Sequence, residues 1–229
     1  MVRAASLFAL LASALVFAAE PVRVSVLYFD VQSNQKELGV LAKGLSELMI
    51  TDLVQSTDLT VVERSRIEDV LAELKLGETR FSDPKTAARI GKLIGAQFIV
   101  IGTIVEAPKP GGGIGPHRLL VRIVDVEKSA AMAKASIKAE LDLEDVFATE
   151  ERVVAEVSKL LVASGAAKVA NEPPKKAHKL PVGTAVKYSR ALDARDKKDK
   201  TQAVKLLNEV VKEQPDFKLA QLDLLNLTK

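Results

Sequence analysis

The feature that most constrains this chain is a close succession of strand and helix patterns between residues 22 and 74. Val22–Asp30 is an apolar, valine-rich run that predicts a strand covered on both faces. Lys36–Gln55 carries leucines at helical spacing and predicts an amphipathic helix. Leu59–Val62 and Glu63–Leu76 repeat this order as a second strand and a second helix. Such an opening favours an α/β fold, in which helices pack on a sheet.

The same alternation continues to residue 164. Asp83-Pro84 predicts a helix start, because aspartate caps helix N-termini and proline suits the first turn, and Gly95 predicts its end. Three further strands and a closing helix are expected at Phe98–Val105, His117–Val126, Ala131–Leu141 and Val146–Ala163. The order predicts a mixed sheet packed with helices.

Five segments of this region carry a family resemblance. They are Val26–Asp30, Gly44–Leu53, Val61–Ile67, Ile90–Gly102 and Arg122–Val126. Together they resemble the CsgG family of curli production assembly and transport components. Related folds occur in FlgO-type flagellar proteins, the N-terminal domain of TolB and activators of penicillin-binding proteins. The resemblance covers residues 22–164 and implies an α/β domain that spans residues 20–164. It also implies a protein that works by assembling with others rather than by catalysis.

Two features depart from the curli channel itself. That channel is a lipoprotein, and this chain has no cysteine to acylate. Membrane-spanning β-hairpins also need strands of about 9–11 alternating residues, whereas Pro108–Pro116 is short and rich in glycine. We therefore expect a soluble relative of the channel that does not span a membrane.

Met1–Ala19 has the pattern of a secretory signal peptide. Arg3 supplies the positive N-terminal region, and Leu7–Phe17 forms the apolar core. The apolar run is shorter than the roughly 20 residues that span a bilayer. We expect removal of this segment after export and a periplasmic protein, either soluble or peripherally associated with the envelope.

A polar segment at residues 165–182 predicts a linker, because it contains the proline- and lysine-rich run Asn171–Lys176. Residues 183–229 then predict a small helical domain, with helices at Val182–Lys198 and Lys200–Gln214 and a third from Phe217. The second helix matches the spacing of a tetratricopeptide repeat at Ala203, Leu207, Val210 and Pro215. A single repeat cannot bury its own apolar face, so the helices must pack on the main domain, on another copy or on a partner. An ordinary helical hairpin remains the alternative.

The charge of the chain is uneven. Residues 19–164 carry 18 Lys and Arg against 22 Asp and Glu, whereas residues 165–229 carry 14 against 8. A basic segment can meet acidic lipids, polymers or proteins, or it can simply be solvated helix surface. Aromatic residues make up only 4% of the chain, which argues against stacking on single-stranded nucleic acid.

Few residues are candidates for chemistry. His117 and His178 are the only histidines and lie far apart in sequence, so we expect neither a metal site nor a catalytic histidine pair. Gly111–Gly115 superficially resembles a phosphate loop, but it is expected to join two strands and is followed by Pro116. Asp30 at a strand end could act as a catalytic acid, or it could cap the following turn.

These observations predict a non-enzymatic accessory protein of envelope assembly or secretion, without a cofactor. Expected partners are envelope proteins of secretion, fibre, flagellar or cell-wall machinery, together with further copies of the chain itself. The alternative is an activator of a cell-wall synthase. A hydrolase that uses Asp30 and the glycine-rich loop is a third hypothesis.

Overall fold

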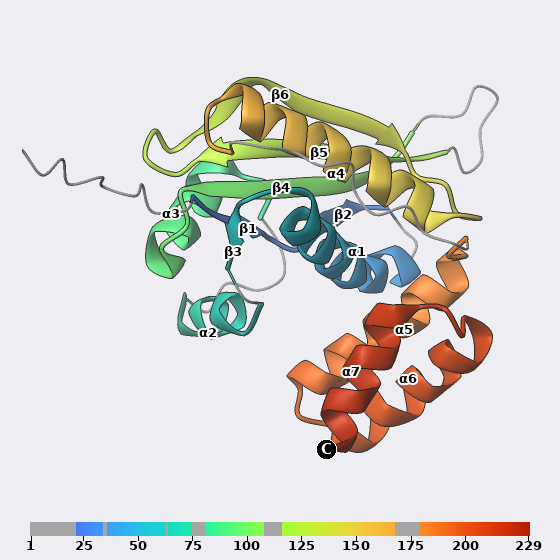
Figure 1. Cartoon of the computed structure of the whole chain (residues 1–229). Coiled ribbons are helices and arrows are strands. Elements are labelled where there is room, and N and C mark those ends of the chain that lie inside the picture. Colours follow the sequence, from blue (N-terminus) through green and yellow to red (C-terminus); the bar gives the residue numbers. More distant parts are fainter. Residues whose placement is uncertain (1–21, 34–35, 63, 75–80, 108–115, 168–178) are drawn as a thin grey trace, which may run out of the picture.

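The computed structural model describes residues 22–33, 36–62, 64–74, 81–107, 116–167 and 179–229. The expected signal peptide, the glycine-rich loop, His178 and most of the expected linker lie outside the described residues. The described part forms a six-stranded mixed sheet with helices on both faces (Figure 1). This confirms the predicted fold class.

The sheet has the order β3-β1-β4-β5-β6, and β2 pairs with the far part of β4. The strands are β1 (Arg23–Val26), β2 (Asp30–Gln32), β3 (Thr60–Val61), β4 (Phe98–Glu106), β5 (His117–Asp125) and β6 (Ala130–Glu140). Strands β1 to β4 pair in parallel, whereas β4, β5 and β6 form an antiparallel meander. The meander lets β5 and β6 keep one face polar, as antiparallel strands commonly do.

The prediction of one strand over Val22–Asp30 is wrong in one respect. The chain instead forms two short strands, β1 and β2, and β2 begins only at Asp30. β1 pairs with β3 and with the start of β4, while β2 pairs with β4 around Thr103. Between them Leu27 and Tyr28 both contact the core on one side of the sheet, and Phe29 returns to the other. Two successive side chains on one side break the alternation of a strand, so the strand is interrupted at this point.

Four helices cover the sheet, at bounds close to the predicted ones: α1 (Lys36–Ser56), α2 (Arg64–Leu74), α3 (Pro84–Ile94) and α4 (Val146–Ala163). α1 and α4 pack on one face, where Val100 and Val121 join their core. α2 and α3 pack on the opposite face, where Ile99 and Ile101 join a second core. Figure 1 shows α1 and α4 in front of the sheet.

Both predicted ends of α3 are confirmed. The Asp83 carboxylate accepts a 2.8 Å bond from the Thr86 amide, and Pro84 begins the helix. The bond from the Thr86 hydroxyl, followed by this bond from the Thr86 amide, lowers the pKa of Asp83 below its ordinary value. At the other end Gly95 has a φ of 74°, which glycine adopts without steric cost, and the neighbouring Ala96 amide donates to Gly91 O.

The C-terminal helices α5 (Val182–Asp196), α6 (Lys200–Glu213) and α7 (Lys218–Thr228) pack on the α/β region through α5. α5 lies against α1, where Lys43 Nζ pairs with Asp193 at 2.9 Å and Gly44 faces Ser189. Buried residues of α1, α4, α5, α6 and α7 form one continuous core. The sequence left three candidates for covering the apolar face of this segment: the main domain, another copy or a partner. The shared core shows that the main domain covers part of it. The tetratricopeptide-like assignment and the domain boundaries stay predictions.

A buried polar cluster fastens α7 to α5. The fully buried Tyr188 hydroxyl donates a 2.8 Å bond to Asp223, whose other oxygen accepts a 2.9 Å bond from Arg195. Burial, and then the Asp223 charge, raise the pKa of Tyr188 well above its ordinary value of 10.0.

This raised pKa predicts a loss of stability in alkali. The folded chain keeps the Tyr188 proton at a pH where the unfolded chain releases it, so the stabilisation is complete below pH 10.0 and is lost as the pH rises through the folded pKa. Urea unfolding between about pH 9 and pH 11 should show a steeper decline for the natural chain than for Tyr188→Phe. Equal declines in the two proteins would contradict this assignment.

Among the described residues, no helix combines the length and the apolar character that crossing a membrane requires.

Candidate functional site

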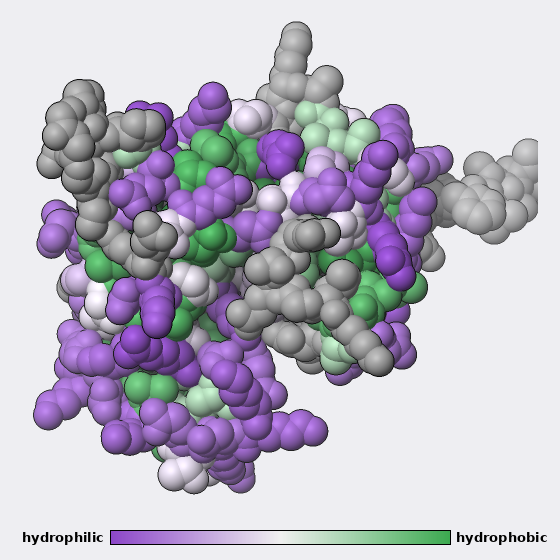
Figure 2. All heavy atoms as spheres, turned by 180° about the vertical axis from the view of Figure 1, so that it is seen from behind, coloured by the Kyte–Doolittle hydropathy of each residue, from purple (hydrophilic) through white to green (hydrophobic). Residues whose placement is uncertain are grey.

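The second face of the sheet is only partly covered. α3 packs over the end near Ile99 and Val124. Toward the other end of β4 and β5, every second side chain still lies on this face of the sheet. No helix among the described residues packs over these side chains. Leu120 is half-buried there, and Lys138 on β6 is exposed. Figure 2 views the molecule from this side and shows hydrophobic surface interspersed with strongly hydrophilic side chains.

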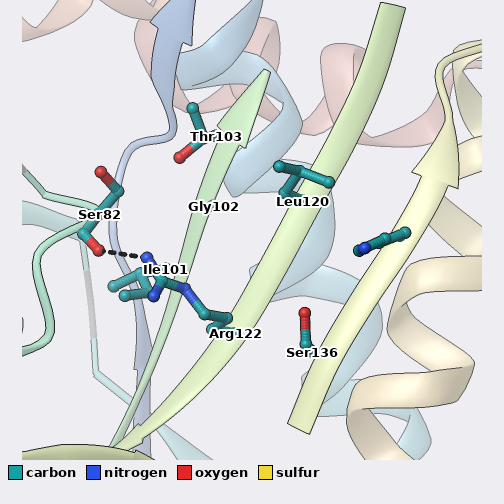
Figure 3. Close-up of a pocket in the computed structure, with 8 residues that line it drawn as sticks. Ser82, Ile101, Gly102, Thr103, Leu120, Arg122 and Ser136 are labelled. Carbon is teal, nitrogen blue, oxygen red and sulfur yellow. Dashed lines mark hydrogen bonds between the residues drawn. The ribbon is translucent and has the colours of Figure 1, made fainter. Parts of the chain in front are cut away.

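A hollow of about 240 Å³ lies on this open half (Figure 3). It is lined by Ser82, Ile101, Gly102, Thr103, Leu120, Arg122, Ser136 and Lys138. Ser82 comes from the loop before α3, and the others come from β4, β5 and β6. The strand register fixes their neighbours, since Leu120 pairs with both Thr103 and Lys138. Three hydroxyl groups, two cations and two large apolar side chains therefore share one concave surface.

Asp30 organises one wall of the hollow. Its two carboxylate oxygens accept bonds from the backbone amides of Phe81 at 3.2 Å and Ser82 at 2.8 Å. The Ser82 carbonyl in turn accepts a 2.8 Å bond from Nη2 of Arg122, which Figure 3 shows reaching from β5 across β4. This continuous chain from β2 to β5 fixes the guanidinium of Arg122 at the edge of the hollow.

On the open face, positively charged side chains without an ion-pair partner outnumber the negatively charged ones. Besides Arg122, the face carries the exposed Arg118 and Lys138, whose side chains make neither a hydrogen bond nor an ion pair with any part of the chain that the structure describes. Glu140, the cross-strand partner of Arg118, is exposed on the same face. The Asp30 carboxylate is already engaged by two amides. The arrangement leaves several N–H and O–H donors facing one small space, which suits an oxyanion.

The residues considered for chemistry from the sequence do not meet in this hollow. His117 is 3% exposed and begins β5 on the opposite face of the sheet, and its Nε2 has no hydrogen-bond partner within the described ranges. Asp30 lies beside the hollow as a bond acceptor, and it caps the loop at residues 81–82 rather than the turn that follows it. Among the described residues, no group of three or more His, Asp or Glu side chains could hold a metal ion.

Sequence reasoning did not single out Arg122, Ser136 or Lys138. The signal was present, because polar residues alternate with buried ones along both strands. Leu119, Val121 and Ile137 lie in the core, while Arg122 and Lys138 face outward. The pattern identifies a polar face of the sheet, but it does not show whether a helix covers that face.

Removing the Asp30 carboxylate is expected to loosen this wall. Asp30→Ala leaves the amides of Phe81 and Ser82 without their acceptor, and we expect a loss of about 1–3 kcal/mol in the free energy of unfolding. Urea unfolding measures the loss, and hydrogen exchange at these two amides should accelerate. The control Asp69→Ala removes an exposed carboxylate on α2 and should change little. Unchanged exchange at both amides in Asp30→Ala would contradict the organising role.

Several solved structures are similar to this chain, among them the following three. The C-terminal domain of LpoB from Salmonella enterica shares 15% identity at a TM-score of 0.37, covering 53% of this chain and 82% of that chain. TolB from Acinetobacter baumannii shares 12% identity at a TM-score of 0.40, covering 63% and 29%. A PelC dodecamer from Paraburkholderia phytofirmans shares 9% identity at a TM-score of 0.30, covering 62% and 85%. A search of curated protein sequences gave no match.

The sequence pattern of one family matches most of the chain. Residues 3–160 match the family described as "Curli production assembly/transport component CsgG". The matched range contains all six strands and α1 to α3, and it includes every residue that lines the hollow. This confirms the resemblance found in the sequence: the chain belongs to the CsgG family.

Proposed function

We propose that this chain is a non-enzymatic accessory protein of envelope assembly or secretion, which acts by binding other proteins and by self-association. The observation that carries the proposal is the match of residues 3–160 to a family described as an assembly and transport component. In this proposal the segment Met1–Ala19 directs export, and the protein works in the periplasm or at the periphery of a membrane.

Two surfaces support a role in protein contacts. The open half of the sheet presents the hollow around Leu120 and Arg122. At the other end of the molecule, α7 exposes Leu222 and Leu225 to 55% and 50%. These two leucines lie one turn apart on the same helix and offer a small apolar surface that a partner protein can cover. The sheet would then bind one partner while the helical segment recruits a second.

Cell fractionation and size measurement test this proposal. The full chain is expressed in its natural host with a C-terminal tag, and the periplasmic and membrane fractions are separated after mild crosslinking. We expect a crosslinked species larger than the monomer in the envelope fractions. A chain that stays in the cytosol, or that is strictly monomeric and gives no crosslink in the envelope, would contradict the proposal. Deleting residues 165–229 is unsuitable as a control, because it would strip α5 from the shared core.

The alternative, an activator of a cell-wall synthase, has a different readout. Adding the purified protein to a penicillin-binding protein would raise the turnover of that enzyme if the chain were such an activator. An assembly protein leaves the turnover unchanged.

A further inference from the structure

The central strand of the open face has a repeating chemistry. Arg118, Leu120 and Arg122 are alternate residues of β5, so their side chains leave the same face of the sheet. Alternate residues of a strand are separated by about 6.5–7 Å. An extended peptide has the same period, so a segment that lies along β5 can meet each of these three side chains in turn.

The donors around Arg122 are arranged for a small oxyanion. Arg122 uses Nη2 for the Ser82 carbonyl, which leaves its remaining N–H groups available. Lys138 stands on β6 beside Leu120, and Ser136 stands beside Arg122. A carboxylate accepts up to four hydrogen bonds, and a guanidinium can bind it through two parallel bonds. The hollow therefore offers one fixed cation (Arg122), one exposed cation (Lys138) and hydroxyl groups to one carboxylate.

We propose that this hollow binds a glutamate or aspartate side chain of an extended acidic segment in a partner protein. The complementary segment carries acidic, apolar and acidic side chains at alternate positions, opposite Arg118, Leu120 and Arg122. This inference rests on the proposed function and deepens it, since it names the chemistry of the partner at one of the two surfaces.

The charges on this face favour a peptide over an anionic membrane. A membrane surface attracts broad clusters of lysine and arginine. Here the cations alternate with the half-buried Leu120, and the Glu140 and Asp30 carboxylates lie on the same face. These carboxylates reduce the attraction for a densely charged surface. Two separate carboxylates on either side of one apolar side chain match this mixture.

Binding of a defined peptide tests the proposal. Fluorescence anisotropy of the purified full-length protein is measured with a labelled, glycine-flanked peptide of sequence Glu-Ser-Leu-Ser-Glu, and the same peptide with glutamine in place of glutamate is the control. We expect Lys138→Gln to weaken binding about threefold and Arg122→Gln about tenfold. The matched control, Lys205→Gln with Lys212→Gln, removes two exposed positive charges from α6 and should have little effect.

Lys138→Gln decides the result if Arg122→Gln disturbs the fold. Lys138 makes no bond with the described residues that its replacement could break, so thermal unfolding of this variant should match that of the natural chain. Binding of the glutamate peptide should also weaken as salt is raised, because exposed charges are screened.

Several results would overturn the inference. One is a failure of the glutamate peptide to bind, or equal binding of the glutamine peptide. Another is an equal loss of binding in the α6 control pair. Orthophosphate or phosphatidylglycerol vesicles that bind through Lys138 where the peptide does not would assign the hollow to phosphate. If the peptide fails while envelope crosslinks persist, the proposed function survives without this site. If the peptide binds but the protein is cytosolic, the site survives and the proposed function does not.

Discussion

Gly44→Leu is expected to lower the free energy of unfolding by about 2–3 kcal/mol, because an overpacked helix contact must spread. A Cβ atom at Gly44 would lie 2.0 Å from Oγ, 3.1 Å from Cβ and 3.5 Å from Cα of Ser189 on α5. The hydroxyl can rotate away, but the backbone of α5 cannot move without leaving α1. Urea unfolding measures the loss, and limited proteolysis should cleave the helical segment faster.

Gly39→Leu is the matched control on the same helix. A Cβ atom at Gly39 meets nothing within 4 Å, so the variant should gain stability by up to about 0.8 kcal/mol through helix propensity. Opposite signs at the two positions would show that the effect comes from the contact between α1 and α5. A neutral Gly44→Leu would mean that α5 does not pack on α1 in solution.

Asp223→Ala is expected to cost about 2–3 kcal/mol, because it removes the acceptor of two partly or fully buried donors. The Tyr188 hydroxyl is fully buried and loses its 2.8 Å bond, and Arg195 loses its ion pair with the same carboxylate. Chemical unfolding of the full chain measures the effect. Asn226→Ala, on the exposed side of α7, serves as the control.

A double-mutant cycle separates the bond from other effects of the substitution. Once Tyr188→Phe has removed the hydroxyl, Asp223→Ala should cost less than it does in the natural chain. Strict additivity of the two substitutions would contradict a direct interaction between these side chains.

The sequence correctly predicted the helices whose bounds depend on residues within the helix or directly next to it. The bounds of α4, Val146–Ala163, agree with the prediction because its apolar positions recur at helical spacing over the whole helix. α3 was predicted from its ends, since Asp83-Pro84 and Gly95 act through bonds within one turn of the helix. The break between β1 and β2 was missed, because the continuous apolar run through Leu27 and Phe29 concealed the loss of alternation.

The placement of the helical segment and of the hollow depends on tertiary contacts. The spacing of Leu207 and Val210 on α6 indicated a helical segment that needs a partner, but it did not show that the segment packs on α1 through α5. Gly44 was the available signal, since a glycine within a helix often marks a close approach of another element. Similarly, Arg122 was seen as part of an alternating strand. Its role in the hollow became visible only once Asp30 and Ser82 were placed beside it.

Photo-crosslinking in living cells tests the central claim most directly. A photoreactive amino acid is placed at Ser136, on the rim of the hollow, and in parallel at the fully buried Ile123 as a control. The account predicts a covalent adduct between the Ser136 variant and another protein or a second copy in the envelope fraction, with none from the Ile123 variant. A chain that remains in the cytosol, or one in the envelope that gives no adduct from Ser136 or from the exposed Leu225, would contradict it.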